Sequence, residues 1–320
     1  MEGIGAVDEF NLIRHLIKAS GNDRMANHDS IVIPPGDDAC LLTAVKRPVI
    51  TTDTQREGVH FERHWQTLAE IGLKAVTVTL SDLAASYARP VSLFINLGLP
   101  ARFPLEEAET LYKGIGIGLE KYGCALGGGN LSNSDRLSLD LFAIGDGHES
   151  IFPLRSNAKP EEGIYCTGPL GLARAGLEAL RKSNLQYRHP ISCFKTPRAR
   201  FDAAAILARH GVICAMDISD GLKGDALHIA EASHLTIDLS IEDRYLAPDL
   251  VSYCSEMGFS AHDFALAGGE DYELLFTCSR ETFRKIAEEL PDAYAVGSCR
   301  PFTGELITAP PSLLSSFQHG

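Results

Sequence analysis

The chain has 320 residues, of which 45% are hydrophobic and 22% are charged, and its formal net charge is −13 at pH 7. Such a composition is typical of a folded globular protein rather than a disordered one, and the length favours two domains over a single core. The negative charge argues against nucleic acid or an anionic membrane surface as the main partner.

The N-terminal stretch "MEGIGAVDEF" lacks a basic segment followed by an apolar one, so we expect no signal peptide. No apolar run approaches the length that spans a bilayer. The eight cysteines are scattered, form no C-x-x-C pair and mostly lie within apolar runs, which predicts reduced core residues. Together these features predict a cytoplasmic protein.

The first half of the chain is predicted to mix helices and strands. Residues 8–20 place their apolar side chains on one helical stripe, with Asp8 as the N-cap, and residues 103–123 repeat that spacing between Pro104 and Gly123. Strand patterns, and a third segment that is helical toward its end, complete this half: strand–turn–strand at 30–43, strand at 47–54, helix within 68–88, a short strand before the glycines at 127–129, and strand at 137–145.

A polar, turn-rich connector, "FPLRSNAKPEEG" at 152–163, is the candidate domain boundary, and we expect domains at 1–150 and 151–320. The second half again mixes both element types. Strands are predicted at 164–168, 212–219, 273–278 and 293–299, and helices at 171–182, 198–211, 221–233 and 281–290. Both halves therefore predict an α/β (α+β) protein of two domains.

Acidic residues recur where apolar strands end or helices begin. They are Asp37, Asp38, Asp53, Asp82, Asp217, Asp220, Glu270 and Asp271. Each one alone is readily explained as a cap or turn residue, and Asp220 fits an N-cap of the helix after Gly221. Caps do not explain why glycine accompanies nearly every site, for example Gly36, Gly127–Gly129 and Gly268. Glycine allows a backbone to approach a ligand closely.

Carboxylates together with the hydroxyls of Thr51, Thr52 and Ser219 are the oxygen ligands that Mg²⁺ prefers. Zinc is disfavoured because neither H-E-x-x-H nor a Cys–His cluster is present. Magnesium held by aspartates would turn an acidic pocket into one that accepts phosphates. No P-loop occurs, and "GIGIGLEKYG" lies within the helical pattern of 103–123 rather than between a strand and a helix.

In chain order, "DEFNLIRHL", "GDDAC", "TTDTQREGVHF", "SDLAAS", "GGGNLS", "RSNAKPEEGIYCTGPLG", "MDISDGL" and "GGEDYELLF" resemble thiamine-monophosphate kinases. That family belongs to the superfamily of aminoimidazole ribonucleotide synthetase and selenophosphate synthetase. The resemblance covers residues 8 to 300 or so. "TDT…EGVHF", "DISDGL" and "GGEDYEL" are specific in combination, whereas "GDDA" alone is weak.

The resemblance implies transfer of the γ-phosphoryl group of ATP to thiamine monophosphate, with several Mg²⁺ ions. It also implies an aminoimidazole-ribonucleotide-synthetase-like fold in a homodimer. The N-terminal domain would bind ATP and Mg²⁺ and join its mixed sheet to the partner's in a barrel, and the C-terminal α/β domain would complete the active site.

Matching positions imply roles for individual residues. The implied Mg²⁺ ligands are Asp37, Thr51, Thr52, Asp53, Asp82, Asn130, Asp217 and Asp220. The implied ATP contacts are Tyr112, Gly129, Asn130, Arg155 and Ser219, and the residues implied to face thiamine monophosphate are His60, Glu270 and Phe317. Asn130 stands where many relatives have an aspartate, and Phe317 substitutes for a C-terminal tryptophan. His60 also fits a core histidine.

The acceptor of such a reaction is a phosphate monoester, which is largely dianionic at pH 7 because its second pKa is about 6. It needs no general base, so we expect direct in-line transfer without an acid–base or covalent catalytic residue. Two alternatives remain open on the same residues. One is a metal-dependent phosphohydrolase with water as acceptor, and the other is a non-catalytic nucleotide-binding homologue.

Overall fold

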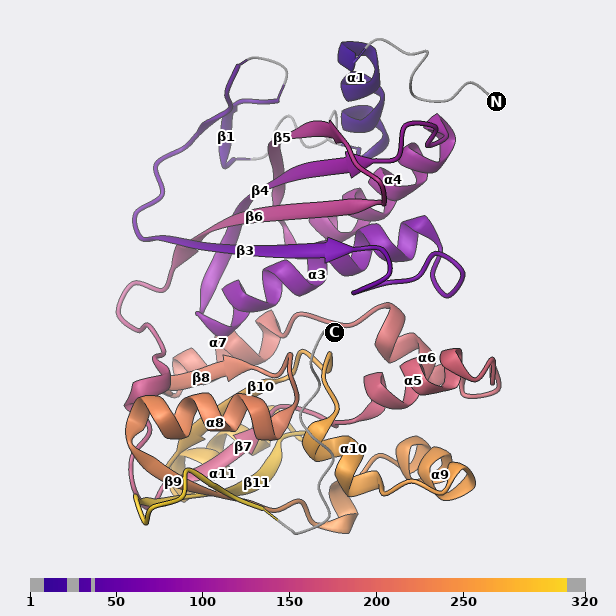
Figure 1. The fold of residues 1–320 in the computed structure, drawn as a ribbon. Coiled ribbons are helices and arrows are strands. Elements are labelled where there is room, and N and C mark those ends of the chain that lie inside the picture. The colour runs from indigo at the N-terminus through magenta and orange to yellow at the C-terminus, as the bar shows by residue number, and fades with distance from the viewer. Residues whose placement is uncertain (1–8, 22–28, 36–37, 310–320) are drawn as a thin grey trace. The chain divides into compact units, whose positions relative to one another are not determined.

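The computed structural model describes residues 9–21, 29–35 and 38–309. They divide into two compact units, shown in Figure 1. The first unit holds the described residues up to Leu83 together with 88–147, and the second holds 84–87 and the described residues from His148 onward. The predicted cap Asp8, the predicted ligand Asp37 and the predicted substrate residue Phe317 lie outside the described residues.

The first unit is built on a four-stranded mixed sheet in the order β3-β6-β4-β5. Strand β6 pairs antiparallel with both β3 and β4, and β4 pairs parallel with β5. Strand β3 therefore lies at an edge. The elements of this unit are α1 (Glu9–Ala19), β1 (Ile31–Ile33), β2 (Leu41–Leu42), β3 (Pro48–Arg56), α3 (Leu68–Ala85), β4 (Ala88–Leu99), α4 (Leu105–Tyr122), β5 (Ala125–Asn133) and β6 (Ser138–Gly147).

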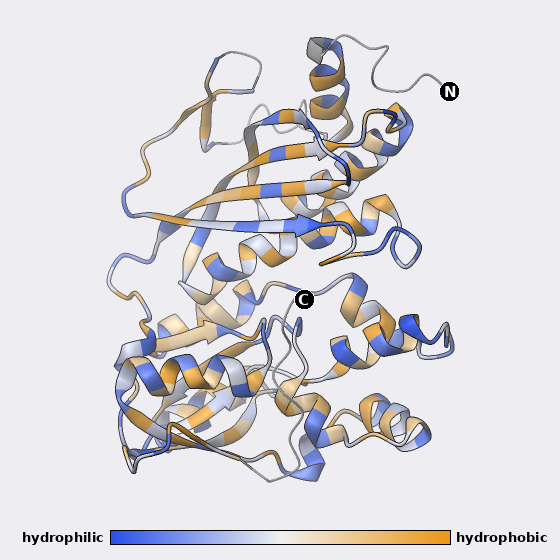
Figure 2. Cartoon of the chain, viewed as in Figure 1, coloured by the Kyte–Doolittle hydropathy of each residue, from blue (hydrophilic) through white to orange (hydrophobic). Residues whose placement is uncertain are grey.

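The two faces of this sheet differ in burial. Side chains alternate between faces along a strand, and Figure 2 shows apolar and polar residues alternating along these strands. Leu139, Leu141 and Ala143 of β6 are fully buried on the face that α3 and α4 cover (Figure 1). Phe142, between them, points to the other face and is 40% exposed, and Ile50 of β3 is 67% exposed. One face of the sheet is thus covered by helices and the other is partly apolar and open.

Gly114, Gly116 and Gly118 of "GIGIGLEKYG" lie inside α4, as predicted, and serve helix packing, whereas Gly123 ends the helix. A Cβ atom on Gly114 would come within 2.0 Å of the carbonyl oxygen of Ala69 in α3. A Cβ on Gly118 would lie 2.8 Å from Cβ of Val76, also in α3. Because glycine has no side chain, α3 and α4 approach each other more closely at these positions than any other residue would allow.

The second unit contains a six-stranded sheet in the order β12-β9-β11-β7-β10-β8, in which only the β12–β9 pair is parallel. Its strands are β7 (Gly163–Cys166), β8 (Cys214–Asp217), β9 (Leu235–Leu239), β10 (Leu274–Cys278), β11 (Tyr294–Pro301) and β12 (Ile307–Thr308). Its helices are η2 (Arg155–Asn157), α5 (Leu172–Arg181), α6 (Arg188–Lys195), α7 (Phe201–Arg209), α8 (Leu222–Ser233), η3 (Asp243–Tyr245), α9 (Pro248–Met257), α10 (Ala261–Ala267) and α11 (Arg280–Glu289).

One core cluster of this unit joins the sheet to α7 and α11. Leu274 and Phe276 of β10 pack with Leu207 of α7 and Ile286 of α11. Tyr165 of β7 lies between these layers, since its ring stacks on Phe283 at 3.8 Å between centroids. Figure 1 shows α8 in front of this sheet.

The predicted α/β (α+β) class is confirmed, and each predicted helix or strand has a counterpart. The strand predicted before the glycine cluster runs through the cluster as β5. The segment 68–88, predicted to be helical toward its C-terminal end, is helical from Leu68 onward as α3. No element is predicted for residues 183–197, which contain α6, or for residues 234–272, although Pro248 at the first turn and Gly258 in the left-handed conformation delimit α9 by ordinary signals. None of the described helices has the length and apolarity needed to cross a membrane.

Candidate active site

Three predicted metal ligands of the first unit lie on β3 and α3, and two of them are in contact. Thr51 and Asp53 are two residues apart on β3, so their side chains share a face. The hydroxyl of Thr51 donates a hydrogen bond of 2.5 Å to a carboxylate oxygen of Asp82 in α3. Asp53 accepts from the backbone N–H of Thr54 at 2.6 Å. Oxygen atoms from a strand and a helix thus gather on the helix-covered face of the sheet edge.

Thr52 does not share this face. It pairs across the sheet with Phe142, and both side chains point to the open face. The next residue with the same orientation, Thr54, donates to Asp140 at 2.7 Å. Any contribution of Thr52 beside Asp53 and Asp82 would therefore have to come from its backbone carbonyl.

His60 lies in a tight turn after β3. Gly58, with φ of +86°, donates from its N–H to the carbonyl of Phe61, whose side chain is buried. Nδ1 of His60 accepts from the backbone N–H of Arg56 at 3.1 Å. A neutral imidazole ring has only one N–H, so here the proton is on Nε2. The turn consequently fixes His60 as a hydrogen-bond donor at Nε2.

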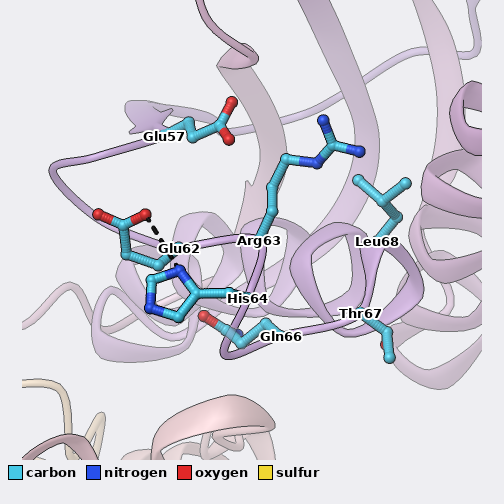
Figure 3. A pocket seen from close by; sticks show the side chains of 7 residues that line it. All are labelled: Glu57, Glu62, Arg63, His64, Gln66, Thr67 and Leu68. Atoms are coloured by element: carbon cyan, nitrogen blue, oxygen red, sulfur yellow. Dashed lines mark ion pairs between the residues drawn. The ribbon is translucent and has the colours of Figure 1, made fainter. Parts of the chain in front are cut away.

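A cavity of about 500 Å³ adjoins this turn and is shown in Figure 3. Its lining residues are Glu57, Glu62, Arg63, His64, Gln66, Thr67 and Leu68. Glu62 and His64 form an ion pair across 3.7 Å, and Arg63 is already paired with Glu107 outside the lining. With Arg63 paired to Glu107 and Glu62 paired to His64, the carboxylate of Glu57 gives the lining its negative charge, which suits a cation better than an anion.

The three predicted nucleotide residues on α4 and β5 occupy different environments. Tyr112 is buried in α4, and burial raises its pKa above the usual range of a tyrosine. Gly129 and Asn130 are exposed on β5. A Cβ on Gly129 would lie 1.9 Å from the carbonyl oxygen of Ile95, so sheet packing alone requires glycine there. Close approach to a ligand, the reason inferred from the sequence, is not needed to explain this residue.

In the second unit, acidic residues crowd the loop after β8. Asp217 ends that strand and is buried, and Asp220 follows three residues later. The backbone N–H of Asp220 donates to the carboxylate of Asp225 in α8 at 3.2 Å. Asp220 is not the N-cap that its position suggested, because the cap of α8 is Gly221 and no side chain caps it.

Asp225 is 1% exposed, and burial raises the pKa of its carboxyl to about 8, with a further increase from the charges of Asp217 and Asp220. Three carboxyl groups thus lie close enough to oppose one another's ionisation. A bound cation would relieve this repulsion. The arrangement favours a positively charged ligand at the C-terminal end of β8.

Glu270 belongs to an irregular segment paired with the same loop. Its backbone N–H donates to the carbonyl of Ser219 at 2.8 Å, and that of Tyr272 donates to Ile218 at 2.8 Å. The predicted substrate residue Glu270 is therefore held beside the predicted ATP residue Ser219. Arg155 lies apart from them on η2 with an exposed side chain, and its carbonyl accepts from Ser233 Oγ at 2.7 Å.

Among the described residues, no three His, Cys, Asp or Glu side chains are already grouped tightly enough to hold a metal ion. The donor chemistry nonetheless fits magnesium, because hydroxyl and carboxylate oxygens gather in both units and the carboxyls around Asp225 repel one another.

Three acidic residues of the second unit have contacts that the sequence motifs do not predict. Asp225 supports the Asp220 loop from one turn into α8. Asp271 and Glu273 flank Tyr272, and Glu273 is paired with Arg200 and accepts from the hydroxyl of Thr167 at 2.5 Å. Asp225 could have been found, since it follows the "DISDGL" motif at helical distance. The partners of Asp271 and Glu273 are about 70 to 100 residues away in sequence and left no local signal.

Residues 36–146 match the family model "AIR synthase related protein, N-terminal domain". A thiamine-monophosphate kinase of Aquifex aeolicus is 35% identical over 251 residues, which cover 77% of this chain and 81% of the relative. One of Bacillus subtilis is 30% identical over 292 residues, covering 88% and 87%.

Solved structures agree with these matches. The structure "AaThiL complexed with AMPPCP and TMP" superposes with a TM-score of 0.77 and 29% identity, covering 98% of this chain and 97% of that one. The thiamine-monophosphate kinase of Stenotrophomonas maltophilia K279a gives 0.82 and 29%, covering 92% and 96%. With its sequence matched over most of its length and its fold matched as well, the chain belongs to the thiamine-monophosphate kinase family.

Proposed function

We propose that this chain transfers the γ-phosphoryl group of ATP to thiamine monophosphate and thereby forms thiamine diphosphate. Membership in the kinase family carries the proposal. The similar structure of AaThiL complexed with AMPPCP and TMP supports this pair of ligands. The first domain, 1–150, binds ATP and magnesium and dimerises, and the second, 151–320, supplies further ligands.

Thr51, Asp53 and Asp82 hold magnesium in the first domain, with the backbone of Thr52 and with Asp37 and Asn130 as further oxygen donors. The hydrogen bond between Thr51 and Asp82 already brings two of these donors together. Asp217 and Asp220 play the same role in the second domain, beside Asp225. When bound, Mg²⁺ supplies charge neutralisation for two phosphate groups that otherwise repel each other.

Asn130 contributes a carbonyl oxygen but no negative charge, so the site near β5 binds its cation less tightly than an aspartate would. Tyr112, Gly129, Arg155 and Ser219 contact ATP. Of these, Arg155 brings a positive charge on an exposed side chain, which suits a phosphate oxygen.

The acceptor is a dianionic phosphate, so no residue has to remove a proton from it, and transfer proceeds in line without a covalent intermediate. His60 donates from Nε2, which the turn leaves protonated. Glu270 and Phe317 complete the contacts to thiamine monophosphate. The thiazolium ring of this substrate is cationic, and the acidic cavity beside His60 has the charge that suits it.

The protein acts as a homodimer through the open face of its first sheet. Ile50 and Phe142 are exposed there, and their cross-strand neighbours Ile144 and Phe94 extend the apolar strip. Exposed apolar area of this kind on a sheet is typical of an interface.

The test is thiamine diphosphate formation from ATP, Mg²⁺ and thiamine monophosphate, with ADP release measured in parallel. We expect ADP and thiamine diphosphate in equal amounts and no ADP without the acceptor. ADP release at full rate without thiamine monophosphate would instead identify a phosphohydrolase. ATP binding in calorimetry without any product would identify a non-catalytic homologue.

A further inference from the structure

The segment "GGEDYE", Gly268–Glu273, joins α10 to β10 in an unusual conformation. Glu270 has φ of +66° and Tyr272 has φ of +52°, so two residues with side chains adopt the left-handed region on either side of Asp271. Such conformations cost free energy and persist only when surrounding contacts hold them. The contacts of this segment therefore determine where Glu270 points.

One side of the segment is held by backbone pairing. The N–H groups of Glu270 and Tyr272 donate to the carbonyls of Ser219 and Ile218, and the N–H of Ile218 donates to the carbonyl of Glu273, each at 2.8 Å. These bonds extend the β10–β8 pairing past the ends of both strands. They hold the backbone of the turn on the side of β8, and side-chain contacts hold its other side.

Asp271 anchors the other side. Its Oδ2 accepts from the backbone N–H of Gly171 at 2.7 Å and its Oδ1 from that of Ala173 at 3.3 Å. Both donors belong to the first turn of α5, whose N-cap Gly171 has no side chain to offer. A carboxyl group that accepts hydrogen bonds from the first N–H groups of a helix satisfies donors that have no partner within the helix. Both oxygens of Asp271 are thus committed to α5.

We infer that Asp271 is a positioning residue for the proposed phosphoryl transfer: by tying the turn to the N-terminus of α5, it holds Glu270 in the orientation that contacts thiamine monophosphate. This rests on the proposed function. Glu270 is 5% exposed, so its side chain has little room to reorient. A shift of the turn would therefore move its carboxylate away from the substrate. The aspartates of the neighbouring loop have their own support, since Asp225 holds the N–H of Asp220.

The experiment compares steady-state kinetics of full-length D271A, E270A and the double variant with the wild type, varying thiamine monophosphate and ATP separately. For D271A we expect the KM for thiamine monophosphate to rise roughly tenfold or more, because small misplacements at a reacting centre are costly. The KM for ATP should change much less, because the backbone hydrogen bonds that join the turn to Ile218 and Ser219 do not involve the Asp271 side chain. The double variant should have the KM of E270A alone, because Asp271 acts through Glu270.

Two further variants separate positioning from stability. S279A removes the N-cap of α11, where Ser279 accepts from the N–H of Thr282 at 3.1 Å, and should lower the melting temperature as D271A does while keeping wild-type kinetics. D271N retains one oxygen for Gly171 but places an amide donor opposite the N–H of Ala173. It should fold if D271A does not, with an intermediate KM for thiamine monophosphate.

A folded D271A or D271N protein with the wild-type KM for thiamine monophosphate would overturn the inference while leaving the proposed function intact. Effects of E270A and D271A that add independently would also overturn it. A wild-type protein that forms no thiamine diphosphate would overturn the proposed function itself. The three results are distinguishable in one set of assays.

Discussion

Thr51 and Asp82 form the contact that joins β3 to α3 at the proposed metal site. Their side chains come from a strand and a helix more than thirty residues apart in sequence, yet they meet at 2.5 Å. The acidic motifs predicted which residues matter, because carboxylates beside glycines are readable in the sequence. That Thr51 faces Asp82 while Thr52 faces away depends on strand register, which the motif "TTDT" does not by itself specify.

Asn substitution of Asp53 or Asp82 should lower turnover roughly a hundredfold or more, because several kcal/mol of charge stabilisation by a metal depend on its ligands. Raising Mg²⁺ should restore part of the activity. The matched control is T54V, whose side chain faces Asp140 on the opposite side of the strand and which should retain wild-type turnover. Full activity of D53N at limiting Mg²⁺ would contradict the assignment.

Asp271 also gives a pH dependence of stability. Burial raises the pKa of its carboxyl to about 8, although the N–H groups of Gly171 and Ala173 lower it in part. The folded pKa exceeds the unfolded one, so at a pH between these two pKa values the folded protein holds a proton on Asp271 that the unfolded chain does not. The free energy of unfolding therefore falls as pH rises through this interval, and the fall ends above about 8. Thermal melts of the metal-free protein across this range should show the decline, and D271N should flatten it. Equal slopes for both proteins would contradict this origin.

At the scale of elements, α4 shows which features its pattern predicts and which it does not. The apolar spacing, Pro104 and Gly123 predicted the helix and both of its ends. The glycines within it have no such local explanation, because their partners Ala69 and Val76 lie on α3. Tertiary contact, which periodicity cannot show, accounts for residues that reduce helix propensity.

Gly114→Ala is therefore expected to destabilise the protein by about 1–3 kcal/mol, although alanine favours helices. The new Cβ would lie 2.0 Å from the carbonyl oxygen of Ala69 and push α3 and α4 apart. Urea unfolding gives the free energy of unfolding directly. Glu120→Ala, on the exposed side of the same helix, should leave it nearly unchanged. A G114A protein as stable as the wild type would show that the two helices can separate at no cost.

On the scale of the whole molecule, the first unit has a covered and an open sheet face, and the second has its own six-stranded core. Composition and alternating elements predicted the α/β class. The strand orders could not be predicted, because they depend on pairings between distant segments such as β3 with β6. The family resemblance supplied the rest of the expected architecture.

The proposed homodimer predicts a change in mass on altering the open face. Phe142→Asp or Ile50→Lys should convert the protein to monomers in analytical ultracentrifugation, because a charge in an apolar interface is costly. Ile117→Asp is the matched control, since this residue is 54% exposed on α4 away from that face. A wild-type protein that sediments as a monomer would contradict the proposal.

The central claim is that magnesium held by these aspartates allows ATP to phosphorylate a phosphate. It is tested most directly by following thiamine diphosphate formation with Mg²⁺ and ATP, using thiamine monophosphate as acceptor and thiamine as the control. We expect thiamine diphosphate from the monophosphate, strict dependence on Mg²⁺, and no diphosphate from thiamine. Failure of thiamine monophosphate to yield diphosphate at any Mg²⁺ concentration, with the protein folded and ATP bound, would contradict it.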